Sequence, residues 1–273
     1  MIEASKKTII FLLIALIILW GLWGFWKISK KWNAKSDSVE IAITNETNIE
    51  LDSSVASVYV TPSKDNTLRV KSTKAGELKV ENDGTTIEIS QKTKIKSGEG
   101  VLTLEIPGKI KTSSVKTSVG SIDISSLNMY KIELKVATGD ITASNIKAYE
   151  LDAEASVGTI DLSDIVATDI EAETKTGDIS LTETNAKTLD ANASIGNVTF
   201  YSGKVDTLEC ETGTGDIYIK LDDKNGTFNI TIGALADAYV FGTELESKSE
   251  TLTFGTGTPN VSAKTKIGSI EIR

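Results

Sequence analysis

Apolar and polar residues alternate along most of the chain after residue 38, in short runs that glycines interrupt. An apolar residue lies two and four positions after each of these glycines, as at Ile122 and Ile124. Most copies also have apolar residues five and seven positions before the glycine, as at Leu134 and Ile132. Alternation with a period of two predicts strands that bury one face, and it does not fit the spacing of a helix.

The glycines themselves recur at a fixed interval. Six of them are nineteen residues apart and a seventh copy lies near the end of the chain: Gly120, Gly139, Gly158, Gly177, Gly196, Gly215 and Gly268. Each is expected to supply the positive φ of a tight structural turn between two strands. A nineteen-residue unit cannot bury its own apolar face, so the units should stack. The sequence therefore predicts an all-β fold, a single-stranded β-solenoid (β-helix) with coils of about 19 residues.

The beginning of the chain has a different pattern. Residues 9 to 26 form an uncharged apolar run of eighteen residues, close to the minimum length of a helix that spans a bilayer. We predict one N-terminal transmembrane helix before the solenoid. A cleaved signal peptide is the alternative, which the lack of a cleavage site disfavours. The predicted divisions are a basic tail (1–7), the anchor (8–27), a juxtamembrane linker (28–38), irregular first coils and a cap (39–112), and a regular solenoid (113–273) with atypical coils at 220–261.

Aromatic and basic residues mark the predicted membrane interface, where amphipathic rings and cations meet lipid headgroups. They are Trp20, Trp23, Trp26, Lys27, Lys30 and Lys31. The lipid bilayer is thus an expected partner. The polar, acidic composition of the body favours a single-pass protein of the cell membrane with its body outside the cytoplasm. The lysines after the span favour the opposite orientation under the positive-inside rule.

Composition excludes several classes of activity. The chain has no histidine and a single cysteine, Cys210, so it has no Ser-His-Asp triad, no imidazole relay, no internal disulfide and no Cys-type zinc site. The net charge of −9 disfavours nucleic acid as a partner. No cofactor is expected.

Short paired strands, a V-x-x-L-x-I-P step from Val101 to Pro107, and TGDI-type words at nineteen-residue intervals resemble the bacterial candidate-adhesin family of β-strand-repeat proteins. The resemblance covers roughly residues 39–273. It implies a β-solenoid of unknown function. The single N-terminal anchor is similar to that of membrane-anchored Lia-type members, which are linked to cell-envelope stress in Gram-positive bacteria.

One row of polar residues is a candidate ligand edge. Asp140, Asp178 and Asp216 each follow a glycine in every second coil. Their oxygens could bind Ca²⁺ or a cationic wall component. The alternative, which we favour, is that these side chains cap the corner by bonding nearby backbone N–H groups. A carboxylate in every second coil is too sparse for a metal cage, so neither a metal site nor a catalytic site is expected.

The predicted function is that of a non-catalytic, membrane-anchored binding or scaffold protein of the cell envelope. A cell-wall polymer or another envelope protein would be its partner. The alternative is a cytoplasm-facing, bactofilin-like scaffold that polymerises end to end. An enzyme such as a glycosidase would need paired carboxylates beside an aromatic sugar platform, and Tyr201 and Tyr218 are not aligned to form one.

Overall fold

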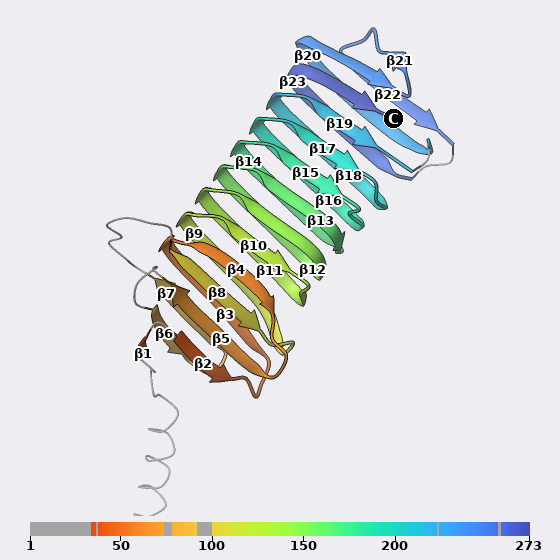
Figure 1. Cartoon of the computed structure of the whole chain (residues 1–273). Helices are drawn as coiled ribbons and strands as arrows, with labels where there is room; N and C mark the ends of the chain where they lie inside the picture. The colour runs from red at the N-terminus through yellow and green to blue at the C-terminus, as the bar shows by residue number, and fades with distance from the viewer. Residues whose placement is uncertain (1–33, 37, 74–77, 92–99, 223, 256–257) are drawn as a thin grey trace, which may run out of the picture.

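The computed structural model describes residues 34–36, 38–73, 78–91, 100–222, 224–255 and 258–273. The regular structure of these residues consists of strands that form one continuous sheet. The sheet winds into a stack of coils along one axis (Figure 1). The β-solenoid part of the predicted fold class is therefore confirmed.

The predicted transmembrane helix requires correction. The described residues contain no helix long and apolar enough to cross a membrane, because their regular secondary structure consists of strands. The fold class of the described residues is thus all-β without a helix, and they give no support to the predicted single-pass membrane location. That prediction rested on the hydropathy of a run of nearly minimal length and on the aromatic and basic residues that flank it. Segment 8–27 and the predicted interface residues, Trp20, Trp23, Trp26, Lys27, Lys30 and Lys31, lie outside the described residues.

The middle of the molecule is a stack of parallel coils whose two strands meet at a glycine. The strands before the glycines are β9 (Ile110–Val119), β11 (Asn128–Thr138), β14 (Asp169–Thr176), β16 (Ala186–Ile195) and β18 (Val205–Thr214). The strands after them are β10 (Ile122–Ser125), β13 (Ile160–Val166), β15 (Ile179–Thr182), β17 (Val198–Tyr201) and β19 (Ile217–Lys220). The long β12 (Ile141–Val157) serves on both sides. Residues nineteen positions apart pair in register, as Ile141 does with Ile160.

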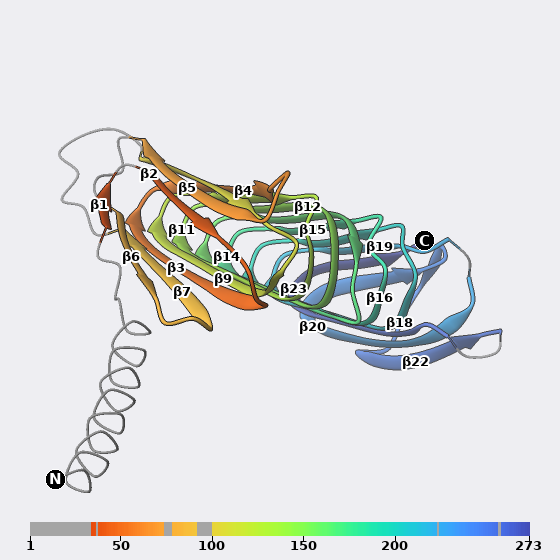
Figure 2. The same ribbon diagram turned by 90° about the horizontal axis from the view of Figure 1, so that it is seen from below.

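The inward rows follow the alternation in the sequence. The row two residues after the glycines is buried throughout: Ile122, Ile141, Ile160, Ile179, Val198, Ile217 and Ile270. The row five residues before them narrows to alanine and cysteine at Ala153, Ala172, Ala191 and Cys210, which are also buried. Figure 2 shows the strands of the two sides as two layers. The residues of these rows belong to the hydrophobic core. The predicted inward rows are confirmed.

At the N-terminal end, the stacking order departs from the chain order. β3 (Thr47–Val55) and β4 (Ser57–Pro62) form a coil that lies between β9–β10 and the coil of β7 (Thr86–Gln91) and β8 (Val101–Ile106). Antiparallel strands cover this end: β5 (Thr67–Thr73) and β2 (Ser38–Ala42) next to β8, and β6 (Leu78–Asn82) and β1 (Ala34–Ser36) next to β7.

The C-terminal end repeats this arrangement. β23 (Asn260–Ile272) pairs in parallel with β18 and β19 on one side and with β20 (Gly226–Val240) on the other. The last strand in sequence is therefore the second-to-last coil in space. β21 (Thr243–Glu244) and β22 (Ser249–Phe254) then run antiparallel to β20. Edge-to-face contacts among Phe228, Phe241 and Phe254 close this end.

Candidate functional site

The glycine corner requires glycine for two reasons. The seven glycines have φ between +128° and +152°, which L-residues rarely adopt. Adjacent coils also approach closely there: a Cβ on Gly177 would lie 2.0 Å from the carbonyl oxygen of Gly158. The same approach recurs at Gly120, Gly139, Gly158, Gly196, Gly215 and Gly268, where the nearest backbone oxygen would be 1.8–2.3 Å away.

The aspartates of the candidate ligand edge are exposed, and each lies two coils from the next. Asp140 Oδ1 accepts a hydrogen bond from the backbone N–H of Thr159 at 2.8 Å, and Asp178 Oδ1 accepts one from Asn197 at 2.7 Å. Asp216 Oδ1 accepts one from Ser269 at 2.7 Å. The fold therefore does not bring the three carboxylates together, and it directs one oxygen of each to the next coil.

A second corner lies six residues after each of the first five glycines, and the residue types there do not reveal it. Its residues have φ between +50° and +65°: Ser126, Asn145, Asp164, Glu183 and Ser202. A left-handed conformation is unusual for Glu, and the nineteen-residue period is the only sequence signal that connects these positions. The corner turns the chain into a short segment that leads to the next coil.

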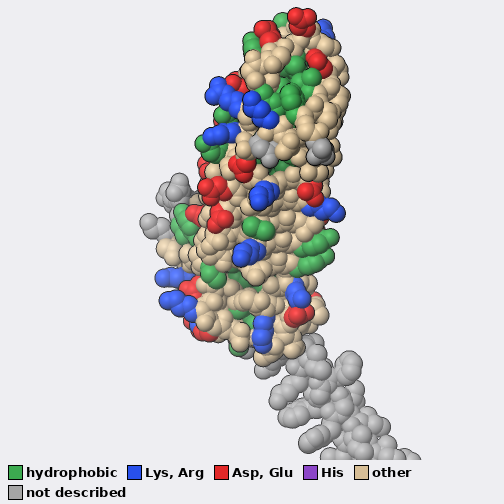
Figure 3. Space-filling model, turned by 90° about the vertical axis from the view of Figure 1, so that its right-hand side faces the viewer, with side chains coloured by type: hydrophobic (Ala, Val, Ile, Leu, Met, Phe, Trp, Pro, Cys, Tyr) green, Lys and Arg blue, Asp and Glu red, His purple; other side chains and the backbone are tan. Residues whose placement is uncertain are grey.

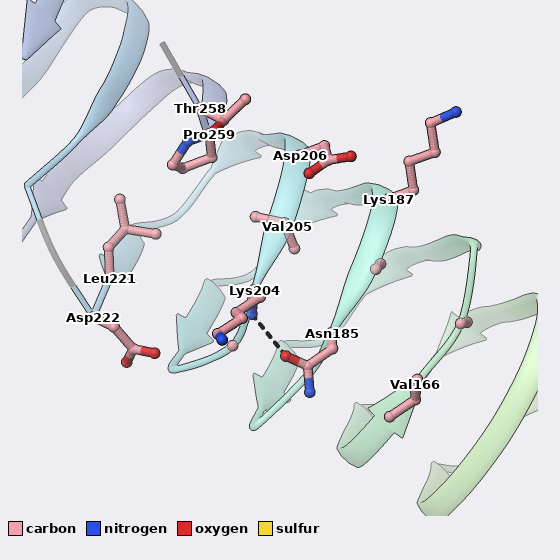
Figure 4. A pocket seen from close by; sticks show the side chains of 13 residues that line it. Val166, Asn185, Lys187, Lys204, Val205, Asp206, Leu221, Asp222, Thr258 and Pro259 are labelled. Carbon is pink, nitrogen blue, oxygen red and sulfur yellow. Dashed lines mark hydrogen bonds between the residues drawn. The ribbon is translucent and has the colours of Figure 1, made fainter. Parts of the chain in front are cut away.

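The segments after this second corner line a groove of about 540 Å³ (Figure 4). Successive coils contribute Val166, then Asn185 and Lys187, then Lys204 and Asp206. Leu221 and Asp222, which follow β19, and Thr258 and Pro259, which precede β23, close its C-terminal end. The groove thus exists because the chain leaves the regular coil after β19 and returns at β23.

Hydrogen bonds to other residues of the solenoid fix the polar groups of the groove. Asn185 Oδ1 accepts a hydrogen bond from the backbone N–H of Lys204 at 2.9 Å, which leaves its amide NH₂ as a donor. Ser202 Oγ donates to Asp222 Oδ1 at 3.2 Å. Within the described part of the chain, neither Lys187 nor Lys204 forms an ion pair. The groove therefore offers the cations Lys187 and Lys204, an amide donor and the carboxylates Asp206 and Asp222 beside an apolar wall.

Two stacked tyrosines lie on the same side of the molecule. The rings of Tyr130 and Tyr149 are parallel to within 2°, with centroids 5.0 Å apart, and the residues are 55% and 47% exposed. The backbone of Tyr149 bonds Thr168 in the next coil, and Thr168 bonds Lys187 in the coil after that, which connects the pair to the groove. From the sequence we considered Tyr201 and Tyr218 and missed this aligned pair. The nineteen-residue separation of Tyr130 and Tyr149 could have revealed them.

A comparison with protein families matches residues 46–273 to the Toastrack DUF4097 model, which covers most of the chain. The chain belongs to the Toastrack DUF4097 family. No curated protein matches it. The family assignment agrees with the adhesin-like resemblance seen in the repeat words, whereas the membrane-anchored, Lia-type detail finds no support in it.

Several solved structures are similar to this chain. A candidate adhesin from Bacteroides fragilis matches with a TM-score of 0.55 and 17% identity, covering 86% of this chain and 96% of that one. A candidate lipid-binding protein from Parabacteroides distasonis gives 0.48 and 20%, covering 86% and 96%. A candidate adhesin from Parabacteroides merdae gives 0.43 and 14%, covering 88% and 97%. At these identities the first match shows a shared fold and nothing about a ligand, and the other two carry no argument.

This Toastrack chain also has an acidic side. Acidic residues of consecutive coils lie next to one another in the strand register and form one column: Glu133, Asp152, Glu171, Asp190 and Glu209. Burial, and then the charges of Glu209, Glu171, Glu173 and Glu211, raise the pKa of Asp190. Lys131 and Lys135 neutralise only the first coils of the column. Among the described residues, no group of acidic, histidine or cysteine side chains is arranged to hold a metal ion.

Proposed function

We propose that this protein is a non-catalytic binding protein of the bacterial cell envelope and that the groove beside β16 and β18 is its binding surface. The observation that carries the proposal is the groove itself, a concave site with an apolar wall and a few fixed polar groups. Sites of that kind are the usual location of ligands. A cell-wall polymer or another envelope protein would be the partner.

The stacked body suits a passive role. The groove residues come from successive coils whose backbones are hydrogen-bonded to each other, as Lys187 is to Thr168. A surface that is ordered before binding loses less conformational entropy when the ligand arrives. The side that bears the groove carries lysines along its middle, with acidic side chains along one edge and a stack of hydrophobic side chains at the other (Figure 3).

The test compares two exposed valines. Val166 lines the groove and is 45% exposed, whereas Val157 is 50% exposed at the glycine corner. Purified full-length protein is mixed with isolated bacterial cell envelopes and sedimented. We expect the wild type and Val157→Asp to sediment with the envelopes, and Val166→Asp to remain in solution. Equal sedimentation of the two variants, or no sedimentation of the wild type, would refute the proposal.

End-to-end polymerisation, the scaffold alternative, is disfavoured by both ends of the stack. Parallel addition needs an open parallel strand, and antiparallel strands lie next to β7, β8 and β20 instead. We therefore expect light scattering to give the mass of a monomer over a wide concentration range. Filaments in electron micrographs of the purified protein would favour the scaffold.

A further inference from the structure

We propose that the ligand is an acidic polysaccharide that lies along the solenoid axis, from the stacked tyrosines Tyr130 and Tyr149 to the groove. This inference rests on the proposed function and names its ligand class. Three features carry it: an exposed aromatic pair, three lysines without ion pairs among the described residues, and the repeating geometry that aligns them.

The aromatic pair is suited to the apolar face of a sugar ring. Tyr130 and Tyr149 are about half exposed although they stack on each other. The next residue in their column is Thr168, whose side chain is much shorter than that of Tyr149. Beyond the pair, in the direction of the groove, the column therefore has room for a ring to lie against the tyrosines. Aromatic side chains favour such flat contacts and keep their hydroxyl groups for hydrogen bonds.

The lysines indicate that the polymer carries negative charge. Lys147 lies two residues before Tyr149, and it pairs in register with Asn128 and Val166. Lys187 and Lys204 line the groove, as do Asp206 and Asp222, so among the described residues the positive charge of this side extends past the groove only through Lys147. Some lysines elsewhere, such as Lys116, Lys131 and Lys264, are paired with carboxylates, whereas others among the described residues, such as Lys175, are not. Carboxylates or phosphates on the ligand would accept charge-assisted hydrogen bonds from the lysines of this side.

The spacing fits a linear polymer. Four coil steps separate Tyr130 from the coil of Lys204, a distance of about 19 Å at roughly 4.8 Å per step. Polar groups recur along that path, with Asn185 between the lysines and its amide NH₂ available as a donor. A repeating chain of several sugar units can therefore contact the tyrosines and Lys204 at the same time.

The experiment uses two forms of one polymer. Polygalacturonate carries a carboxylate on each sugar, and its fully methyl-esterified form has the same backbone without the charge. Binding of each to full-length protein is measured by isothermal titration calorimetry at low and at moderate salt. We expect polygalacturonate to bind, the ester to bind at least about tenfold more weakly, and added salt to weaken binding because it screens the lysines.

Matched variants locate the site. We expect Tyr149→Ala and Lys204→Gln each to weaken polygalacturonate binding about threefold to tenfold, and Lys204→Gln also to reduce its salt dependence. The controls are Tyr59→Ala, a tyrosine 44% exposed on β4, and Lys175→Gln, an exposed lysine at the glycine corner. Both controls should bind as the wild type does. Thermal unfolding of each variant establishes that it is folded.

The outcomes separate this inference from the proposed function. If the ester binds as well as the acid, or if the controls lose as much affinity as Tyr149→Ala and Lys204→Gln, the inference is wrong. If polygalacturonate does not bind while envelopes still retain the wild type and not Val166→Asp, the inference falls and the proposed function stands. If the wild type itself does not sediment with envelopes, both the proposed function and this inference are wrong.

Discussion

The side chain that follows a corner glycine accepts a hydrogen bond from the backbone of the next coil in five of the seven copies. The acceptor is a carboxylate at Asp140, Asp178 and Asp216 and an amide at Asn197, whose Oδ1 accepts from the N–H of Asp216 at 2.8 Å. Since Asn197 performs the same task without a charge, the row needs an acceptor oxygen rather than a carboxylate. Neutral residues between the aspartates also keep like charges from stacking directly.

Two substitutions of Asp178 should therefore differ in their effect on the free energy of unfolding. Asp178→Asn keeps the oxygen that accepts from Asn197, so its free energy of unfolding should match that of the wild type. Asp178→Ala removes the acceptor and should cost about 1 kcal/mol, the usual worth of one hydrogen bond. Urea unfolding measures both. A calcium-binding edge would instead make the two variants alike and would make the melting temperature of the wild type rise with added Ca²⁺.

Gly177 tests the corner itself. Gly177→Ala forces an L-residue to φ +146° and places its Cβ 2.0 Å from the carbonyl oxygen of Gly158. We expect a loss of more than about 3 kcal/mol in the free energy of unfolding, because backbone strain and steric overlap add. Gly108 is the control, since a Cβ there meets nothing within 4 Å, and Gly108→Ala should change stability by less than about 0.5 kcal/mol. Similar losses at the two positions would contradict the corner geometry.

At the scale of the strand pair, the periodic features of the coil could be predicted and the aperiodic ones could not. Period-two alternation identifies the buried Ile160 and Leu162 because apolar burial dictates residue type there. The second corner escapes notice because exposure permits Asp164, Glu183 and Ser202 alike. The groove also depends on where the chain leaves the coil after β19, which no local pattern specifies.

Stacked coils place like charges next to each other just as they place apolar residues next to each other, and at Asp190 this lowers the stability of the fold. In the folded protein, burial and neighbouring carboxylates raise the pKa of Asp190 above its ordinary value of 3.8. The folded state therefore binds a proton more tightly than the unfolded chain. The column therefore destabilises the fold at neutral pH, and this cost disappears as the pH falls to below 3.8, where Asp190 is protonated in both states.

We therefore expect Asp190→Asn to stabilise the protein at pH 7, by up to about 1 kcal/mol given solvent screening. The gain over the wild type should shrink as the pH is lowered toward the ordinary carboxyl range. Thermal unfolding of both proteins across this pH range measures it. Asp161→Asn is the control, because Asp161 stacks between Thr142 and Ser180 and has no carboxylate directly above or below it. A gain that is independent of pH would mean that charge is not the cause.

At the scale of the whole molecule, both ends of the stack are locked by a chain that turns back. β3–β4 and β23 each lie one coil in from the end of the parallel stack, so the end coil is held by a strand distant in sequence. The words around Gly268 predict a regular coil, and that coil does stack on Gly215. They do not indicate that β20 lies beyond it, because each coil is equally compatible with a neighbour on either side.

The position of β23 makes a truncation informative. In a simple solenoid, removing the last strand would trim one end. Here, ending the chain at Pro259 removes the buried Val261, Ala263, Ile270 and Ile272 from between β18–β19 and β20. Burial of side chains of this size is worth about 1.5–3 kcal/mol each for valine and isoleucine, so β20 and its cap should detach from the stack. Hydrogen exchange should then show that residues 226–254 lose protection while the coils from β11 to β15 keep theirs. Arg273→Ala removes only surface contacts with Glu271 and Tyr218, and it should leave residues 226–254 protected. Retained protection in the truncated protein would mean that β20 can stack directly on β18 and β19, and that β23 does not hold it in place.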